Sequence, residues 1–143
     1  MISDKKLINI PEECSRYKAK SKKGISHRHQ ESDIQKACVN WFRATHRPLA
    51  KLLFSIPNGG SRHPLEAKNM KAEGIVEGVA DLCLAVPNKD YHGFYIEMKT
   101  NNPKTYQKPA QKEWQELIQE QGYKYVVCRS RIEFSEEINN YLK

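Results

Sequence analysis

The chain alternates between two spacings of its apolar residues, one typical of helices and the other of strands. From Glu31 apolar residues recur every three or four positions, which predicts an amphipathic helix; they are Ile34, Ala37, Cys38, Trp41 and Phe42. Pro48 closes the loop that follows. The segment 51–56, KLLFSI, then predicts a strand that ends at the loop PNGG.

The middle of the chain predicts a short helix and a hairpin. Pro64 fits the first turn of a helix over 65–73, and Gly74 fits its end. The segments 78–86 and 93–100 are apolar and strand-like, with the turn PNKDYHG between them. We expect these two strands to pair with each other, although the sequence leaves other pairings open.

The last part of the chain predicts a helix, a strand and a second helix. After a loop at 101–108, Pro109 opens a helix that ends at Gly122. Its expected inner face consists of Ala110, Trp114, Leu117 and Ile118. YKYVVC at 123–128 is the last strand, and the run from Ser130 to Glu133 fits a capping box that starts the final helix.

This order of elements predicts an α/β domain over residues 30–143, with one central mixed sheet flanked by helices. Residues 1–29 are polar and basic and have no sustained apolar period, so we expect an arm or extension there. A nucleic-acid-binding arm and a solvated tail explain this composition equally well.

The composition is that of an ordinary globular protein, with 38% hydrophobic and 29% charged residues among 143. No apolar run approaches the about 20 residues that span a bilayer, and the N-terminus lacks the apolar segment of a signal peptide. We therefore expect a cytoplasmic protein without membrane contact. The four cysteines form no CxxC pair, which predicts buried reduced thiols instead of a zinc site. The net charge of +7 favours a polyanionic partner, but only weakly.

Candidate chemistry lies at the end of the strand FYIEMK, where Glu97 and Lys99 stand two apart and so share one face. Asp81 begins the neighbouring predicted strand, so pairing would bring both carboxylates to one end of the sheet, with Lys99 beside them. Two carboxylates at one point suit Mg²⁺ or Mn²⁺, and a nearby lysine can orient or deprotonate a water. From spacing alone, a solvated strand face and a turn aspartate are the commoner explanation.

Three motifs in succession make the pattern more specific. They are Gly78-Val79-Ala80-Asp81, then Glu97-Met98-Lys99, then a helix carrying Gln111 and Trp114 before Gly122. Over residues 31–130 this succession resembles the VRR-NUC family of the PD-(D/E)XK nuclease superfamily, and PNGG and KAEG resemble its compact, virus-type members. Ala80 stands where the family motif has proline, a residue that donates no ligand.

The resemblance implies a restriction-endonuclease-like core and a role for each matching residue. Asp81, Glu97 and the Met98 carbonyl would bind Mg²⁺, with Mn²⁺ as a substitute, and Lys99 would act on the attacking water. Glu31 matches an acidic helix residue at the metal site, and Gln111 would line its rim and hold the DNA strand or the catalytic lysine. Without a role at the metal site, Glu31 would be an acid that interacts favourably with the helix dipole, and Gln111 would be an exposed helix residue.

The resemblance also implies a substrate. We expect a metal-dependent endonuclease that acts as a homodimer on branched DNA such as four-way junctions, in the host-cell cytoplasm if virus-encoded. Basic residues near the proposed site would contact phosphates; they are Arg62, Lys68, Lys71, Lys104 and Lys108. The alternatives are a flap-directed or restriction-like nuclease, a DNA-binding module with a vestigial metal site, and an RNA-binding protein.

Overall fold

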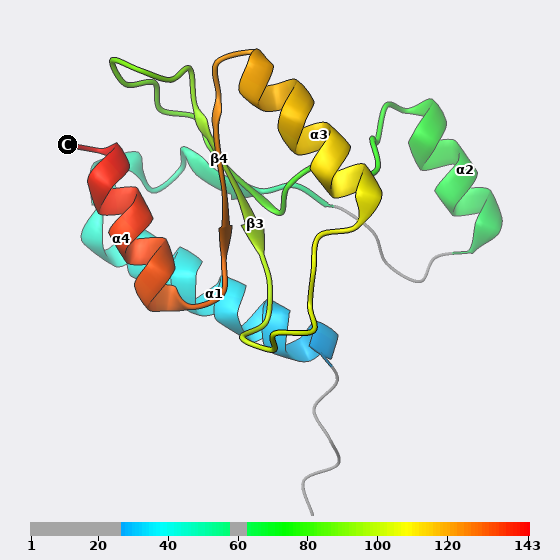
Figure 1. Cartoon of the computed structure of the whole chain (residues 1–143), viewed down its shortest axis with the longest axis horizontal. Coiled ribbons are helices and arrows are strands. Elements are labelled where there is room, and N and C mark those ends of the chain that lie inside the picture. The colour runs from blue at the N-terminus through cyan, green and yellow to red at the C-terminus, as the bar shows by residue number, and fades with distance from the viewer. Residues whose placement is uncertain (1–26, 58–62) are drawn as a thin grey trace, which may run out of the picture.

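The computed structural model describes residues 27–57 and 63–143 (Figure 1). Its elements follow the predicted order, with a short 3₁₀ helix in the loop that Pro48 was expected to close. They are α1 (His27–Thr45), η2 (Arg47–Leu49), β1 (Leu53–Ser55), α2 (Pro64–Ala72), β2 (Leu82–Leu84), β3 (Phe94–Met98), α3 (Pro109–Glu120), β4 (Lys124–Cys128) and α4 (Arg131–Tyr141). Helix α1 begins four residues before Glu31, and the rest of the expected arm lies outside the described residues.

The strands form one mixed sheet in the order β1-β2-β3-β4. Strand β2 pairs antiparallel with both β1 and β3, whereas β3 and β4 run parallel. The predicted hairpin is thereby confirmed, with Leu82 opposite Ile96. A parallel β3–β4 pair requires a crossover, and α3 supplies it.

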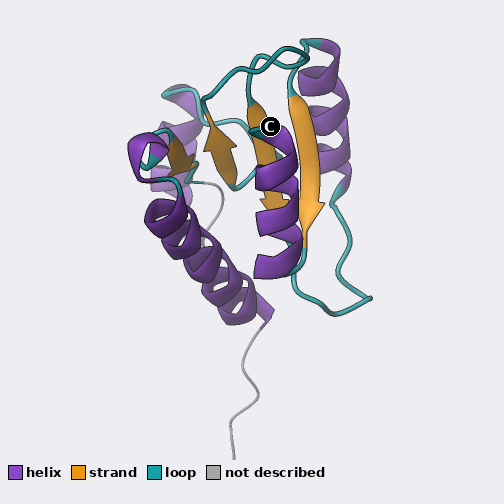
Figure 2. Ribbon diagram, turned by 90° about the vertical axis from the view of Figure 1, so that its left-hand side faces the viewer, coloured by secondary structure: helices purple, strands orange, loops and turns teal. Residues whose placement is uncertain are grey.

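Helices cover both faces of the sheet, α1 and α4 on one and α3 on the other (Figure 2). The alternation of β3 explains this arrangement, because Phe94, Ile96 and Met98 belong to the core shared with α1 and α4. Tyr95 lies on the opposite face, where its ring meets Trp114 of α3 edge-on at 4.8 Å between centroids. Glu97 shares that face with Tyr95, so the strand itself aims the candidate carboxylate towards α3.

Two helical positions differ from the expected pattern. Leu117 was placed on the inner face of α3 but is 55% exposed, and Ala37 of α1 is exposed as well. The half-buried stripe of α3 runs through Ala110, Trp114 and Ile118 at four-residue spacing, which leaves Leu117 at its edge.

The cysteines agree with the sequence prediction where the structure describes them. Cys38, Cys83 and Cys128 are buried free thiols, and burial raises the pKa of Cys38 to about 11. Cys14 lies outside the described residues. Among the helices of residues 27–57 and 63–143, none is long and apolar enough to span a membrane.

Candidate active site

Asp81 and Glu97 lie next to the last residue pair of the β2–β3 ladder. That pair is Leu82 and Ile96, with Asp81 directly before Leu82 and Glu97 directly after Ile96 in the chain. The Asp81 carboxylate accepts a hydrogen bond from the Met98 amide at 2.8 Å, and its carbonyl accepts one from the Ile56 amide at 2.8 Å. These bonds fix both the backbone and the side chain of Asp81.

Glu97 is 1% exposed, and among the described residues only one of its two carboxylate oxygens has hydrogen-bond partners. Its Oε1 accepts hydrogen bonds from Lys99 Nζ at 2.6 Å and from the Gln111 side-chain amide. Its Oε2 is buried and has no hydrogen-bond partner among the described residues. A buried carboxylate oxygen without a partner is costly, and a bound cation would satisfy it. The residues present therefore fit a hard divalent metal ion.

Burial and neighbouring charges shift the pKa of both carboxyl groups. Burial raises the pKa of Glu97 to about 7, the charge of Asp81 raises it as well, and Lys99 opposes the shift. Burial also raises the pKa of Asp81, against the hydrogen bond from the Met98 amide and the charge of Lys99. Two neighbouring carboxylates repel each other, which favours a cation between them or a proton on one of them.

The raised pKa predicts how stability changes with pH. Folded Glu97 holds its proton more tightly than unfolded Glu97, so this residue contributes stability below about pH 4.5 that is lost as the pH rises to about 7. Replacing it by glutamine should therefore raise the melting temperature at about pH 8 by roughly 5 °C relative to the wild type, and less at about pH 5. Thermal unfolding in chelator at both pH values measures this difference. A difference in melting temperature between variant and wild type that is the same at both pH values would contradict the prediction.

Gln111 links the start of α3 to Glu97. Its side-chain carbonyl accepts from the Lys108 amide at 2.8 Å, which fixes the amide so that its NH₂ group faces Glu97. The structure thus places Gln111 against the Glu97 carboxylate, and its expected contact with the DNA strand or with Lys99 stays a prediction. Gly78 sets the approach of α3, because its φ is +89° and a Cβ there would lie 2.3 Å from the carbonyl oxygen of Ala110.

Glu31 lies on α1, half-buried, and its charge raises the pKa of both Asp81 and Glu97. In the described part of the chain no three His, Cys, Asp or Glu side chains converge on a common metal position. Glu31 therefore sits near the pair without completing a three-carboxylate site. Two carboxylates are sufficient for Mg²⁺, which usually keeps several water ligands.

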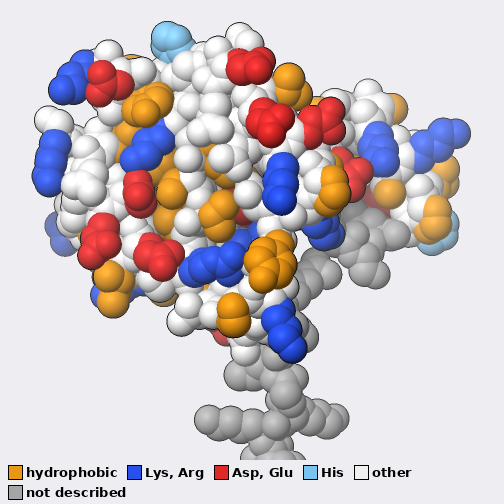
Figure 3. Space-filling model, in the orientation of Figure 1, with side chains coloured by type: hydrophobic (Ala, Val, Ile, Leu, Met, Phe, Trp, Pro, Cys, Tyr) orange, Lys and Arg blue, Asp and Glu red, His pale blue; other side chains and the backbone are white. Residues whose placement is uncertain are grey.

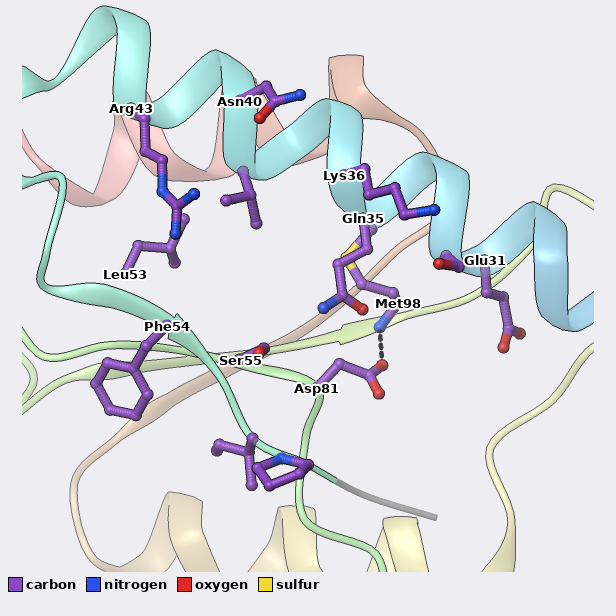
Figure 4. Close-up of a pocket in the computed structure, with 14 residues that line it drawn as sticks. Glu31, Gln35, Lys36, Asn40, Arg43, Leu53, Phe54, Ser55, Asp81 and Met98 are labelled. Carbon is purple, nitrogen blue, oxygen red and sulfur yellow. Dashed lines mark hydrogen bonds between the residues drawn. The ribbon is translucent and has the colours of Figure 1, made fainter. Parts of the chain in front are cut away.

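One cleft, of about 620 Å³, runs between α1 and β1 and ends at Asp81 (Figure 4). We call it the α1 cleft. Its α1 wall is mostly polar and includes Gln35, Lys36, Asn40 and Arg43. These residues were not singled out from the sequence, although Lys36, Asn40 and Arg43 recur at helical spacing on one face, which was the available signal.

A second cleft, of about 870 Å³, lies between β3, α2 and the start of α3, and we call it the α3 cleft. It holds Asp81, Glu97, Lys99 and Gln111, and it shares Glu31, Pro57 and Asp81 with the α1 cleft. The structure thus brings the predicted catalytic residues together at the junction of two clefts.

The predicted phosphate contacts divide into three groups. Lys71, Lys104 and Lys108 line the α3 cleft, whereas Lys68 is exposed on α2 and lines neither cleft. Arg62 lies outside the described residues. On the face shown in Figure 3, basic side chains lie over α2, and acidic side chains gather over the outer surfaces of α3 and α4.

Comparisons with known proteins agree with this architecture. The family model for the VRR-NUC domain matches residues 16–132. A solved structure described as a VRR_NUC domain protein is 29% identical in sequence and superposes with a TM-score of 0.68, covering 79% of this chain and 88% of that chain. No curated protein matches. The mixed sheet flanked by helices is consistent with the PD-(D/E)XK-like core that the sequence predicted.

Proposed function

Because the chain belongs to the VRR-NUC family, a nuclease-type family, we propose that it is an endonuclease that hydrolyses DNA phosphodiester bonds with the help of a divalent metal ion. One observation carries the proposal: the buried Glu97 Oε2 has no hydrogen-bond partner among the described residues. Asp81 lines the same cleft, and the Lys99 ammonium donates to the other oxygen of the Glu97 carboxylate. A merely structural ion pair gains nothing from a second, half-buried carboxylate next to it.

Asp81 and Glu97 would hold the metal ion, Mg²⁺ or in its place Mn²⁺, with the Met98 carbonyl as a further ligand. Such an ion lowers the pKa of a bound water and neutralises charge that develops on the phosphate. The Met98 amide and Gln111 keep the two carboxylates in place before the ion and the substrate bind. Preorganisation of this kind removes the cost of ordering the ligands during the reaction.

Lys99 would position the attacking water. Its side chain is buried and lines the α3 cleft, and Glu97 accepts one of its N–H groups. The remaining N–H groups are available to a water molecule or a phosphate oxygen in that cleft. Glu31, at the junction of the clefts, would act through water near the metal ion.

The clefts suggest how DNA is bound. Arg43 and Asn40 in the α1 cleft, and Lys71, Lys104 and Lys108 in the α3 cleft, offer phosphate contacts on either side of Asp81. Contacts of this type carry no sequence information, so shape would decide the preferred substrate. Two sites at a fixed separation in a homodimer would favour a four-way junction.

Cleavage of a DNA panel tests the proposed function. Junction, flap, splayed and linear DNAs, with a single-stranded RNA, are incubated with Mg²⁺ or Mn²⁺, and sedimentation gives the mass of the protein. We expect a dimer that makes paired nicks in the junction in preference to linear duplex, and no cleavage in chelator. Preferential cutting of the flap would favour the flap-directed alternative. Cleavage in chelator would contradict the metal-dependent mechanism.

A further inference from the structure

The loop between β3 and α3, residues 100–108, is fixed by the side chain of Arg129. The guanidinium donates hydrogen bonds to the Thr100 carbonyl at 2.8 Å, the Thr105 hydroxyl at 3.0 Å and the Thr105 carbonyl at 2.8 Å. Within the loop, Asn102 accepts from the Lys104 amide at 2.9 Å, and its carbonyl accepts from the Thr105 hydroxyl at 2.7 Å. Such a loop can bind a ligand without first being ordered.

The side chains of this loop alternate between inside and outside. Gln107 points inward, where its amide donates to Gln115 at 2.9 Å and to the Tyr125 hydroxyl at 3.1 Å. Tyr106, between the anchored Thr105 and Gln107, is 73% exposed. It lines the α3 cleft together with Lys104 and Lys108. The loop therefore presents one aromatic ring between two cations, in the cleft that holds Glu97.

An exposed tyrosine is common on protein surfaces and needs no explanation by itself. Here the residues on both sides of Tyr106 are anchored by hydrogen bonds, and the two lysines near it match the charge of a phosphodiester chain. An aromatic ring between cations is the combination that binds single-stranded nucleic acid, because every base can stack on it while the cations contact phosphates. A base inside a duplex is already stacked on its neighbours and offers no free face.

We propose that Tyr106 is the stacking platform for an unpaired base of the substrate, next to the phosphate that is cleaved. Lys104 and Lys108 contact the adjoining phosphates, and Arg129 is a positioning residue that holds the loop in place. The inference rests on the proposed nuclease function and adds a specific substrate feature to it: an unpaired nucleotide at the branch point or on a single-stranded arm. Stacking of an unpaired base on Tyr106 would make a single protomer prefer branched over linear DNA.

Binding experiments in chelator test this inference without relying on cleavage. The probes are a splayed-arm DNA with 2-aminopurine at the unpaired positions and a linear duplex with the same base. Wild-type protein and Tyr106→Phe should quench the fluorescence of the splayed probe. Tyr106→Ala should lose the quenching and bind the splayed DNA about tenfold more weakly, with duplex affinity unchanged. Tyr91→Ala is the control, since Tyr91 is an exposed aromatic residue that lines neither cleft.

The positioning role of Arg129 is tested by the affinity for splayed DNA divided by the affinity for duplex DNA. A general loss of stability would lower both affinities and leave this ratio unchanged. Arg129→Lys keeps the charge but loses the forked geometry, so the ratio should fall while the duplex affinity stays the same. Wild-type affinity and quenching in Tyr106→Ala would overturn the inference and leave the nuclease proposal intact. Normal binding and quenching by wild-type protein that cuts no DNA with Mg²⁺ would instead contradict the nuclease proposal alone.

Discussion

Replacing Glu97 by glutamine is expected to lower the rate of DNA cleavage by roughly a thousandfold or more, because the metal ion would lose a charged ligand that supports several kcal/mol of transition-state stabilisation. Glutamine has nearly the same shape, so the core around β3 should remain packed. Asp81→Asn should have a comparable effect. Single-turnover cleavage of junction DNA with Mg²⁺ measures the loss.

Glu113→Gln is the matched control, because Glu113 is an exposed carboxylate on α3 that lines neither cleft. It should cleave at the wild-type rate. Thermal unfolding in chelator shows whether each variant is folded, and DNA affinity should change little. Near-wild-type turnover of Glu97→Gln or Asp81→Asn would show that the metal site has been assigned to the wrong residues.

Replacing Lys99 by alanine is expected to reduce cleavage by at least about a hundredfold while Mn²⁺ binding is retained, because an ammonium positions water but is not a metal ligand. Lys99→Arg should also be poor. A guanidinium is larger, stays charged and cannot take a proton from water. Calorimetry with Mn²⁺ and cleavage assays on the same preparations separate the two effects.

The pH of the metal titration matters for this variant. Lys99 lowers the pKa of Glu97, so its removal raises that pKa and leaves less of the carboxylate deprotonated near neutral pH. The titration should therefore be made at about pH 8.5, above the pKa of about 7 in the wild type. Lys112→Ala, an exposed lysine of α3, is the control. Loss of the Mn²⁺ signal at this pH would mean that Lys99 has a different role.

The spacing of apolar residues predicted the fold because it carries most of the information about which face of each element is buried. The stripe through Cys38 and Phe42 directs α1 against the sheet, and the alternation in FYIEM separates the core face of β3 from the face that carries Glu97. The hairpin prediction placed Asp81 and Glu97 at one end of the sheet, and the structure has this hairpin, with Leu82 opposite Ile96 as its last pair before them. Local patterns could thus bring Asp81, Glu97 and Lys99 to one end of the sheet, whereas their roles and the choice of Glu31 and Gln111 came from the family resemblance.

The contacts that specify the site could not be predicted in this way, because they join residues far apart in the sequence. Strand β2 begins at Leu82, later than expected, and just before it the Met98 amide donates to the Asp81 side chain instead of to a strand carbonyl. No periodicity relates Arg129 to the loop at 100–108. The contact of Gln111 with Glu97 depends on how closely Gly78 lets α3 approach.

The central claim is that Asp81 and Glu97 hold a metal ion between them, and diffraction from crystals grown with Mn²⁺ tests it most directly. Anomalous scattering locates manganese independently of any assay of activity. We expect one peak at the junction of the α1 and α3 clefts, in contact with the Asp81 carboxylate and Glu97 Oε2, and no peak there in Glu97→Gln crystals. A fully ordered wild-type site without manganese, or manganese bound only elsewhere, would contradict the account.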